Sequence, residues 1–255
     1  MKRTLPLFLW QIAFAIFVLL AWWLLNLANI GSAILPPMPE VISHFLAAPW
    51  EPDFRAGFGH TVFDAIRGLV IATILAVPIG VLIGMFPTLE RSTRAVIDFG
   101  RSFPVIALLP ILVLVIGANP TMKVVAITIA CFFPILIPSI YGARRLEPTI
   151  VDTVRAYRIP AHLRFARVLL PAAGPYVATG LRIATAVSIL VAVGVEIVSL
   201  TLGIGREISL SRSYGQTATA FAYIFYAGFL GVAVTLLWDL LEKRLLGWHL
   251  RSGRE

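Results

Sequence analysis

Residues 124–143, VVAITIACFFPILIPSIYGA, are twenty consecutive residues without a charged side chain. A helix needs about 20 predominantly apolar residues to cross the hydrocarbon core of a bilayer, so this stretch predicts a transmembrane helix. Outward from it, comparable uncharged stretches occur four more times, and a fifth is interrupted only by Glu196. These stretches comprise residues 4–39, 68–89, 102–122, 213–238 and 183–205.

Together they predict an all-α, polytopic membrane protein with six transmembrane helices. None of them alternates polar and apolar residues as the strands of a closed barrel would. The first is longer than the apolar part of a signal peptide, so we expect it to be retained as a span. We expect a single transmembrane domain over residues 1–255, with spans at about residues 7–30, 61–86, 96–116, 122–143, 176–202 and 217–241.

The composition agrees with this fold class. The 255 residues are 59% hydrophobic and 13% charged, with a mean hydropathy of +0.90; a soluble domain carries about a quarter charged residues. If the N-terminus is cytoplasmic, sixteen Lys and Arg residues fall on or near the cytoplasmic side, and four fall outside: Arg55, Lys123, Arg206 and Arg212. This bias predicts that both termini are cytoplasmic, and it explains the net charge of +8 without a nucleic-acid partner.

The sequence offers no pattern for catalysis or metal binding. It lacks a phosphate-binding loop, an H-E-x-x-H helix and a G-x-S-x-G elbow. Its single cysteine, Cys131, lies in a predicted span, and its four histidines are scattered without ligand spacing. We therefore expect no enzyme activity, no metal and no cofactor on this chain.

A polar, arginine-rich segment at residues 144–171, here called the elbow, separates the fourth and fifth predicted spans. Pro148 and Pro160 divide it into two short helices, at about residues 148–157 and 161–169. The apolar residues of the second helix share one face at helical spacing: Leu163, Ala166, Leu169 and Leu170. Such an amphipathic segment could dock onto another protein or lie on an anionic lipid surface.

The spacing within the elbow resembles the EAA loop of ABC-importer permeases. That loop has the pattern E-A-A-x3-G-x9-I-x-L-P, and this chain has Asp152-Thr153-Val154-x3-Arg158-x9-Val168-x-Leu170-Pro171. The chain is similar to the nitrate, taurine and aliphatic-sulfonate branch of these binding-protein-dependent permeases. Motifs similar to those of the branch also occur in order outside the loop: residues 34–39, Pro78-Ile79-Gly80, Pro104 with Pro110, Phe133-Pro134, Pro175-x4-Gly180-Leu181-Arg182 and Gly203-Ile204-Gly205.

The resemblance implies a function and a set of partners. The chain would be a permease in a bacterial inner membrane and would form the path for a small solute, with a second, identical or paralogous permease subunit. A periplasmic or lipid-anchored binding protein would deliver the solute. A cytoplasmic ATPase dimer, which would hold the ATP and Mg²⁺, would dock on coupling helices in the elbow. The residues that match the loop are the implied coupling residues: Asp152, Thr153, Val154, Arg158, Val168, Leu170 and Pro171.

Three elbow residues depart from the family's pattern in chemical type. Thr153 and Val154 replace two alanines, and Arg158 stands where the loop has glycine. Because glycine permits a positive φ that is costly for arginine, we expect the turn between the two elbow helices to differ in shape. Alternatively, Arg158 reaches an acidic residue on the ATPase, in which case Arg158→Glu would uncouple ATP hydrolysis from transport.

Four residues are candidates for the translocation path or its gate: Glu196, Arg101, Pro104 and Pro110. An ionisable group inside a span is costly, so it usually faces a helix-bundle interior or water. Glu196 therefore either lines a pathway or anchors neighbouring helices through hydrogen bonds. Arg67 and Arg101 are its possible partners.

Prolines and small residues indicate how the helices pack. The prolines of the third helix, and Pro134 and Pro138 in the fourth, predict kinks that either shape a cavity or improve packing. Gly80 and Gly84, four residues apart, predict a close helix–helix approach, more within one subunit than at a dimer seam.

Two other function classes remain to be weighed against a permease. A secondary transporter or channel would need coupling-ion sites and usually an internal repeat, and the sequence shows one carboxylate deep inside a span, Glu196, and no repeat. An intramembrane enzyme would need clustered catalytic residues, and none is evident. The sequence encodes no ligand-selective pocket, so the identity of the solute does not follow from it.

Overall fold

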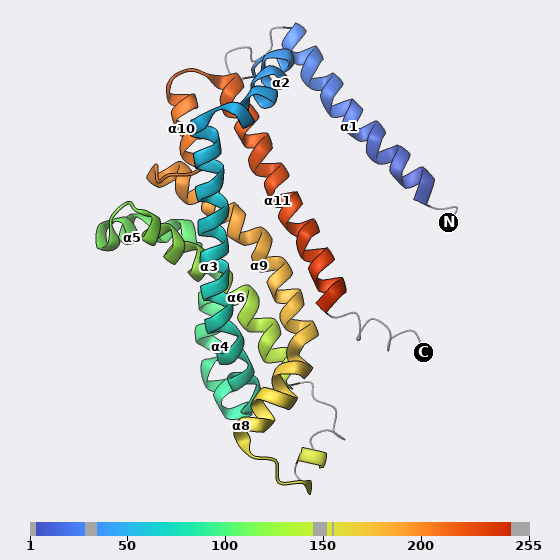
Figure 1. Ribbon diagram of the computed structural model, residues 1–255, viewed down its shortest axis with the longest axis vertical. Coiled ribbons are helices and arrows are strands. Elements are labelled where there is room, and N and C mark those ends of the chain that lie inside the picture. The colour runs from blue at the N-terminus through green and yellow to red at the C-terminus, as the bar shows by residue number, and fades with distance from the viewer. Residues whose placement is uncertain (1–3, 29–34, 145–151, 155, 246–255) are drawn as a thin grey trace. The chain divides into compact units, whose positions relative to one another are not determined.

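The computed structural model describes residues 4–28, 35–144, 152–154 and 156–245. Within these ranges every regular element is a helix (Figure 1), which confirms the all-α fold class. In chain order, the helices are α1 (Thr4–Leu27), α2 (Met38–Ala47), α3 (Pro52–Met85), α4 (Pro87–Ser102), α5 (Leu109–Ile116), α6 (Pro120–Arg144), α8 (Ala161–Arg164), α9 (Leu170–Ser199), α10 (Ile204–Ser213) and α11 (Thr217–Leu245).

Five helical segments among the described residues are long and apolar enough to cross a membrane: Leu9–Leu27, Pro52–Met85, Pro120–Arg144, His162–Ser213 and Thr217–Arg244. A sixth span results only if α4 and the following segment, Val105–Ile116, are counted together. The prediction of a polytopic helical membrane protein is confirmed, and the predicted count of six depends on this one bent pair.

The third predicted span differs from the expectation. Instead of one kinked helix over residues 96–116, α4 begins at Pro87, and it meets Val105–Ile116 at an angle of 85°. Phe103 has an extended backbone with ψ 124° because the following residue, Pro104, disfavours the helical region for its predecessor. The sixteen residues of α4 include five charged ones, so hydrocarbon is an unfavourable environment for this helix.

The chain divides into two compact units, residues 1–56 with 207–226 and residues 57–206 with 227–255. In the first unit, α2 packs against the start of α11. Val41 is buried together with Ala218 and Ala222, and partly buried aromatic side chains surround them. The hydroxyl group of Tyr226 donates a hydrogen bond of 2.8 Å to the backbone carbonyl of Phe45.

In the second unit, α3 and α6 approach each other at glycines of α3. A Cβ atom at Gly80 would lie 2.6 Å from Cβ of Ser139, and one at Gly84 would lie 2.5 Å from the carbonyl oxygen of Ile140. Both distances are too short for any residue larger than glycine. The prediction that this small-residue pair packs within one subunit is confirmed.

Helix α9 also packs closely against α6, at Gly180. A Cβ atom at Gly180 would lie 2.8 Å from the carbonyl oxygen of Pro134. Pro134 and Pro138 both lie inside α6, which continues through them. Pro104, by contrast, lies at the break between α4 and Val105–Ile116, so the prolines of the third and fourth predicted helices have different effects.

Candidate functional site

Three ionisable side chains, Asp64, Lys123 and Glu196, meet inside the second unit and are here called the buried charge cluster. They come from α3, from the first turn of α6 and from the last turn of α9. The side chains of Lys123 and Glu196 are 0% exposed, and that of Asp64 is 3% exposed. Because charges without solvent are costly unless they are paired, their contacts decide what the cluster can do.

Lys123 contacts groups from three other segments of the chain. Its Nζ donates hydrogen bonds of 2.9 Å to Oε1 of Glu196 and 2.7 Å to the backbone carbonyl of Leu202. Asp64 Oδ2 lies 2.7 Å from the same Nζ, an ion pair without hydrogen-bond geometry. The lysine therefore connects α3 and α6 to the end of α9 and the turn that follows it.

The Glu196 carboxylate is surrounded by further donors. The hydroxyl oxygen of Thr61 lies 2.9 Å from both carboxylate oxygens, and the backbone N–H of Gly205 donates to Oε2 at 2.9 Å. The same hydroxyl oxygen accepts a hydrogen bond of 2.9 Å from the backbone N–H of Ile204. Each carboxylate oxygen thus has two polar neighbours, an arrangement that anchors the group.

The turn between α9 and α10 closes over this carboxylate. A Cβ atom at Gly203 would lie 1.9 Å from Cδ of Glu196, and one at Gly205 would lie 2.4 Å from the carbonyl oxygen of Val193. Only residues without a side chain fit so close to the carboxylate. The Gly203-Ile204-Gly205 motif therefore has a structural reason in this fold.

The predicted partners of Glu196 are wrong. Arg67 lies 3.8 Å from Asp64, and Arg101 pairs with Asp98 at 3.1 Å. The actual partner is Lys123, which the distribution of basic residues places on the outer side of the membrane. One sequence feature does indicate this partner: Lys123 is the only charged residue between Arg101 and Arg144.

The four residues predicted to line the translocation path do not lie together. Arg101 and Pro104 line a pocket of about 440 Å³, together with apolar side chains that include Phe133 and Ile183. Pro110 is exposed and Glu196 is buried in the charge cluster, and neither lines this pocket. The structure therefore brings together two of the four predicted path residues.

The first part of the elbow lies partly outside the described residues, Pro148 included. Asp152 and Thr153 are exposed and Val154 is buried, all three in helical conformation. The backbone N–H of Ile159 donates to the carbonyl of Val154 at 3.1 Å, and Arg158 has a φ of 47°. This is the pattern of a Schellman cap, in which a left-handed residue ends a helix.

The turn at Arg158 therefore has the left-handed backbone that glycine favours. The expected change of shape at this position is not found, because the arginine adopts the positive φ instead of avoiding it. For a non-glycine residue this conformation costs about 1–2 kcal/mol. The exposed arginine side chain is thereby held on a fixed, strained turn.

The second elbow helix does not end where the sequence predicted. α8 passes at Phe165–Leu169 into a π-helical turn and then into α9, so the backbone is helical from Ala161 to Ser199. Pro171 lies in the first turn of α9 and has no N–H to donate, and a π-turn accommodates this. On the predicted apolar face, Leu169 is buried, whereas Ala166 and Leu170 are exposed.

These features agree with the comparisons to known proteins. Residues 76–247 match the family described as the binding-protein-dependent transport system inner membrane component. The chain belongs to this family. The matched range includes the whole elbow, Lys123 and Glu196.

Two curated relatives and one solved structure are informative. The chain is 26% identical to a putative aliphatic sulfonates transport permease protein of Bacillus subtilis, over 91% of this chain and 85% of the relative. It is 25% identical to a taurine transport system permease protein of Escherichia coli, over 91% and 86%. A structure of the inward-facing MetNI methionine ABC transporter matches the fold with a TM-score of 0.63 and 18% identity, over 74% of this chain and 94% of that chain.

The family assignment establishes the general function. The chain is a membrane-spanning permease of an ABC importer, as the resemblance in its sequence predicted, and the alternative of a secondary transporter or channel is not favoured. Its relatives are transport permeases rather than enzymes. Membership implies an ATPase and a substrate-binding protein as partners.

Proposed function

We propose that the elbow docks onto a separate cytoplasmic ATPase and transmits its movements directly to α9. The observation that carries this proposal is the uninterrupted helical backbone from Ala161 to Ser199. At 1.5 Å per residue, the distance along the helix from Ala161 to Glu196 is about 50 Å. A displacement at the elbow therefore moves the helix that carries a member of the buried charge cluster.

The exposed side chains of the elbow support the same proposal. Asp152, Tyr157 and Arg158 are exposed, as are the apolar Ala166 and Leu170 on the second elbow helix. Together they supply charged, aromatic and apolar contacts of the kinds that protein interfaces use. With Thr153, Val154, Val168 and Pro171, they make up the proposed coupling segment.

The remaining parts of the proposal concern the assembly. Two permease subunits, identical or paralogous, enclose the path for a small solute that a binding protein delivers from outside. ATP and Mg²⁺ bind to the ATPase subunits, so that hydrolysis takes place there. Both termini of this chain lie on the cytoplasmic side of a bacterial inner membrane, as the distribution of Lys and Arg indicates.

Charge reversal at Arg158 tests the coupling role. The complete transporter, with its ATPase and binding protein, is reconstituted in liposomes, and ATP hydrolysis and solute uptake are measured together. We expect Arg158→Glu to reduce uptake per ATP hydrolysed by about tenfold or more, because charge-assisted contacts contribute about 1.5–3 kcal/mol each. Unchanged coupling in this variant would refute the role of the arginine side chain.

Arg158→Gly is the matched control for backbone geometry. Glycine keeps the positive φ of the turn but removes the side chain, so it separates the shape of the elbow from its charge. The driving force is tested in the same liposomes, since vanadate should stop uptake and ionophores should not. Inhibition by ionophores alone would favour a secondary transporter.

A further inference from the structure

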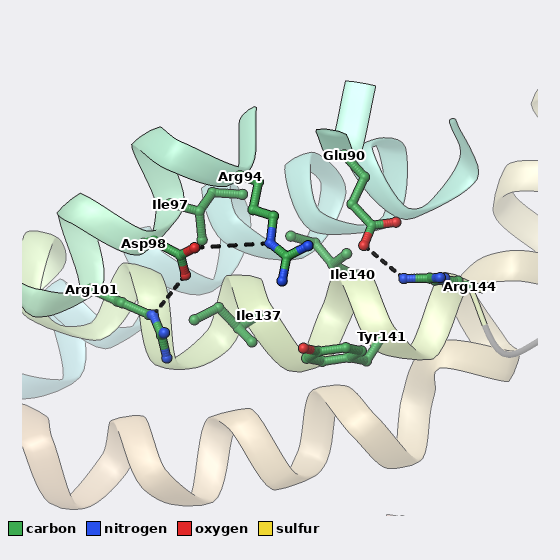
Figure 2. Close-up of a pocket in the computed structure, with 9 residues that line it drawn as sticks. All are labelled: Glu90, Arg94, Ile97, Asp98, Arg101, Ile137, Ile140, Tyr141 and Arg144. Atoms are coloured by element: carbon green, nitrogen blue, oxygen red, sulfur yellow. Dashed lines mark hydrogen bonds and ion pairs between the residues drawn. The ribbon is translucent and has the colours of Figure 1, made fainter. Parts of the chain in front are cut away.

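A second group of charged side chains lies at the other end of α6, in a pocket between α4 and α6 (Figure 2). The pocket has a volume of about 250 Å³ and is here called the arginine pocket. It contains three guanidinium groups and two carboxylates. Its lining residues are Glu90, Arg94, Ile97, Asp98, Arg101, Ile137, Ile140, Tyr141 and Arg144.

The positive charges exceed the negative ones, and one arginine is poorly paired. Arg144 lies 2.8 Å from Glu90, and Arg101 lies 3.1 Å from Asp98. Among the described residues, Arg94 pairs only with the same Asp98, at 4.0 Å from Nε to Oδ2, and its side chain is 82% exposed. The pocket therefore holds one guanidinium group whose donors are largely unused.

Further polar and apolar groups face the same space. In Figure 2 the guanidinium group of Arg94 points from α4 toward α6, and the hydroxyl group of Tyr141 points toward the side where Arg101 lies. That hydroxyl has no hydrogen-bond partner within the part of the chain that the structure describes. Ile137 and Ile140 contribute the apolar wall. Two guanidinium groups and a phenol can thus donate to one ligand.

We infer that the arginine pocket binds a phosphate oxyanion and thereby ties α4 to α6 beside the elbow. A guanidinium group can donate two parallel hydrogen bonds to a phosphate, which the ammonium group of a lysine cannot do in the same geometry. Arg94 and Arg101 therefore suit a phosphate ligand. Basic pockets between membrane helices bind phosphate-bearing lipid headgroups. A soluble phosphate has the same chemistry, so the source of the oxyanion is decided by experiment.

Binding at this position would stiffen a weakly packed helix. None of the side chains of α4 is buried, although Gly100 approaches the ring of Phe133 on α6 closely. Arg144 is the last residue of α6 and the first residue of the elbow. An oxyanion between the two helices would therefore fix α4 next to the segment that we propose to meet the ATPase. The inference does not depend on that proposal.

The test uses the full-length chain in the assembled transporter, in nanodiscs. The first probe is phosphatidylglycerol, whose retention is measured by native mass spectrometry against a phosphatidylcholine background. The second probe is inorganic phosphate, titrated by calorimetry in nanodiscs of phosphatidylcholine alone. We expect Arg94→Gln to weaken binding of one of these probes by about tenfold, as loss of a charge-assisted pair does.

Arg91→Gln is the matched control, because Arg91 is an exposed arginine of the same helix that does not line the pocket. If Arg94→Gln lowers phosphatidylglycerol retention and Arg91→Gln does not, the ligand is a lipid headgroup. If Arg94→Gln weakens the binding of inorganic phosphate and Arg91→Gln does not, the ligand is a soluble anion. Equal losses in the two variants, or no dependence on Arg94 with either probe, would overturn the inference.

Discussion

The two ends of α6 carry charged groups that differ in burial and in the number of their hydrogen-bond and ion-pair partners. At the first turn, Lys123 is fully buried and contacts Asp64, Glu196 and a backbone carbonyl. At the last residue, Arg144 has a side chain that is 61% exposed and pairs only with Glu90 among the described residues. Both ends contain a cation and carboxylates, so charge type alone does not separate an anchor from an exchangeable site.

The two ends differ in whether water can take the place of a lost ion-pair partner. Water cannot reach Lys123, so loss of this lysine would leave two buried carboxylates without a compensating charge. Water can solvate Arg144 and Arg94, so their partners can exchange at small cost. We conclude that the buried end fixes the positions of three helices and that the exposed end is free to bind a ligand.

The largest expected effect comes from removing the buried cation. Lys123→Met keeps much of the side-chain volume but leaves Asp64 and Glu196 facing each other without it. We expect the free energy of unfolding to fall by about 3–5 kcal/mol, as for other broken buried pairs. Chemical denaturation in detergent micelles measures this loss.

The control is Lys243→Met, in the exposed last turn of α11. It makes the same substitution where water can solvate the lysine, and its effect should stay near zero. Similar effects of the two substitutions would show that the burial of Lys123 does not determine its contribution.

A smaller effect is expected for Glu196→Gln, which removes one charge but keeps the shape of the side chain. We expect a loss of about 2 kcal/mol, because hydrogen bonds to a charged group are replaced by bonds to an amide. If Glu196 is an anchor, uptake per correctly folded transporter stays at the wild-type value. Slower uptake at unchanged stability would instead assign the residue to the translocation path.

The sequence predicted the fold better than it predicted the partners within it. Uncharged stretches of spanning length locate helices directly, whereas the pairing of Glu196 depends on which helices are neighbours. Lys123 stands at the edge of a span, and a residue at that position can face the interface or the helix-bundle interior. No local pattern distinguishes these cases, so Arg67 and Arg101 were equally plausible partners.

In two other motifs, too, the sequence pattern was visible but the contacts that explain it were not. The spacing in Pro175-x4-Gly180-Leu181-Arg182 was recognisable, but its reason is tertiary: Gly180 fits against α6, and Arg182 pairs with Asp239 at 3.0 Å on α11. The break at Pro104 was predicted only as a kink. The structure has a bend of 85° there, and it separates the charged α4 from the apolar segment Val105–Ile116.

The smallest expected effect tests the exposed end of α6. Arg144→Gln removes the ion pair with Glu90, whose side chain is 26% exposed. Because exposed pairs contribute about 0–1 kcal/mol, we expect the free energy of unfolding to change by less than about 1 kcal/mol. Combination with Glu90→Gln in a double-mutant cycle isolates the pair from other effects of each substitution. A coupling energy above about 2 kcal/mol would mean that this end of α6 is also an anchor. The arginine pocket would then hold its charges for packing, and the contrast between the two ends would be one of position rather than of role.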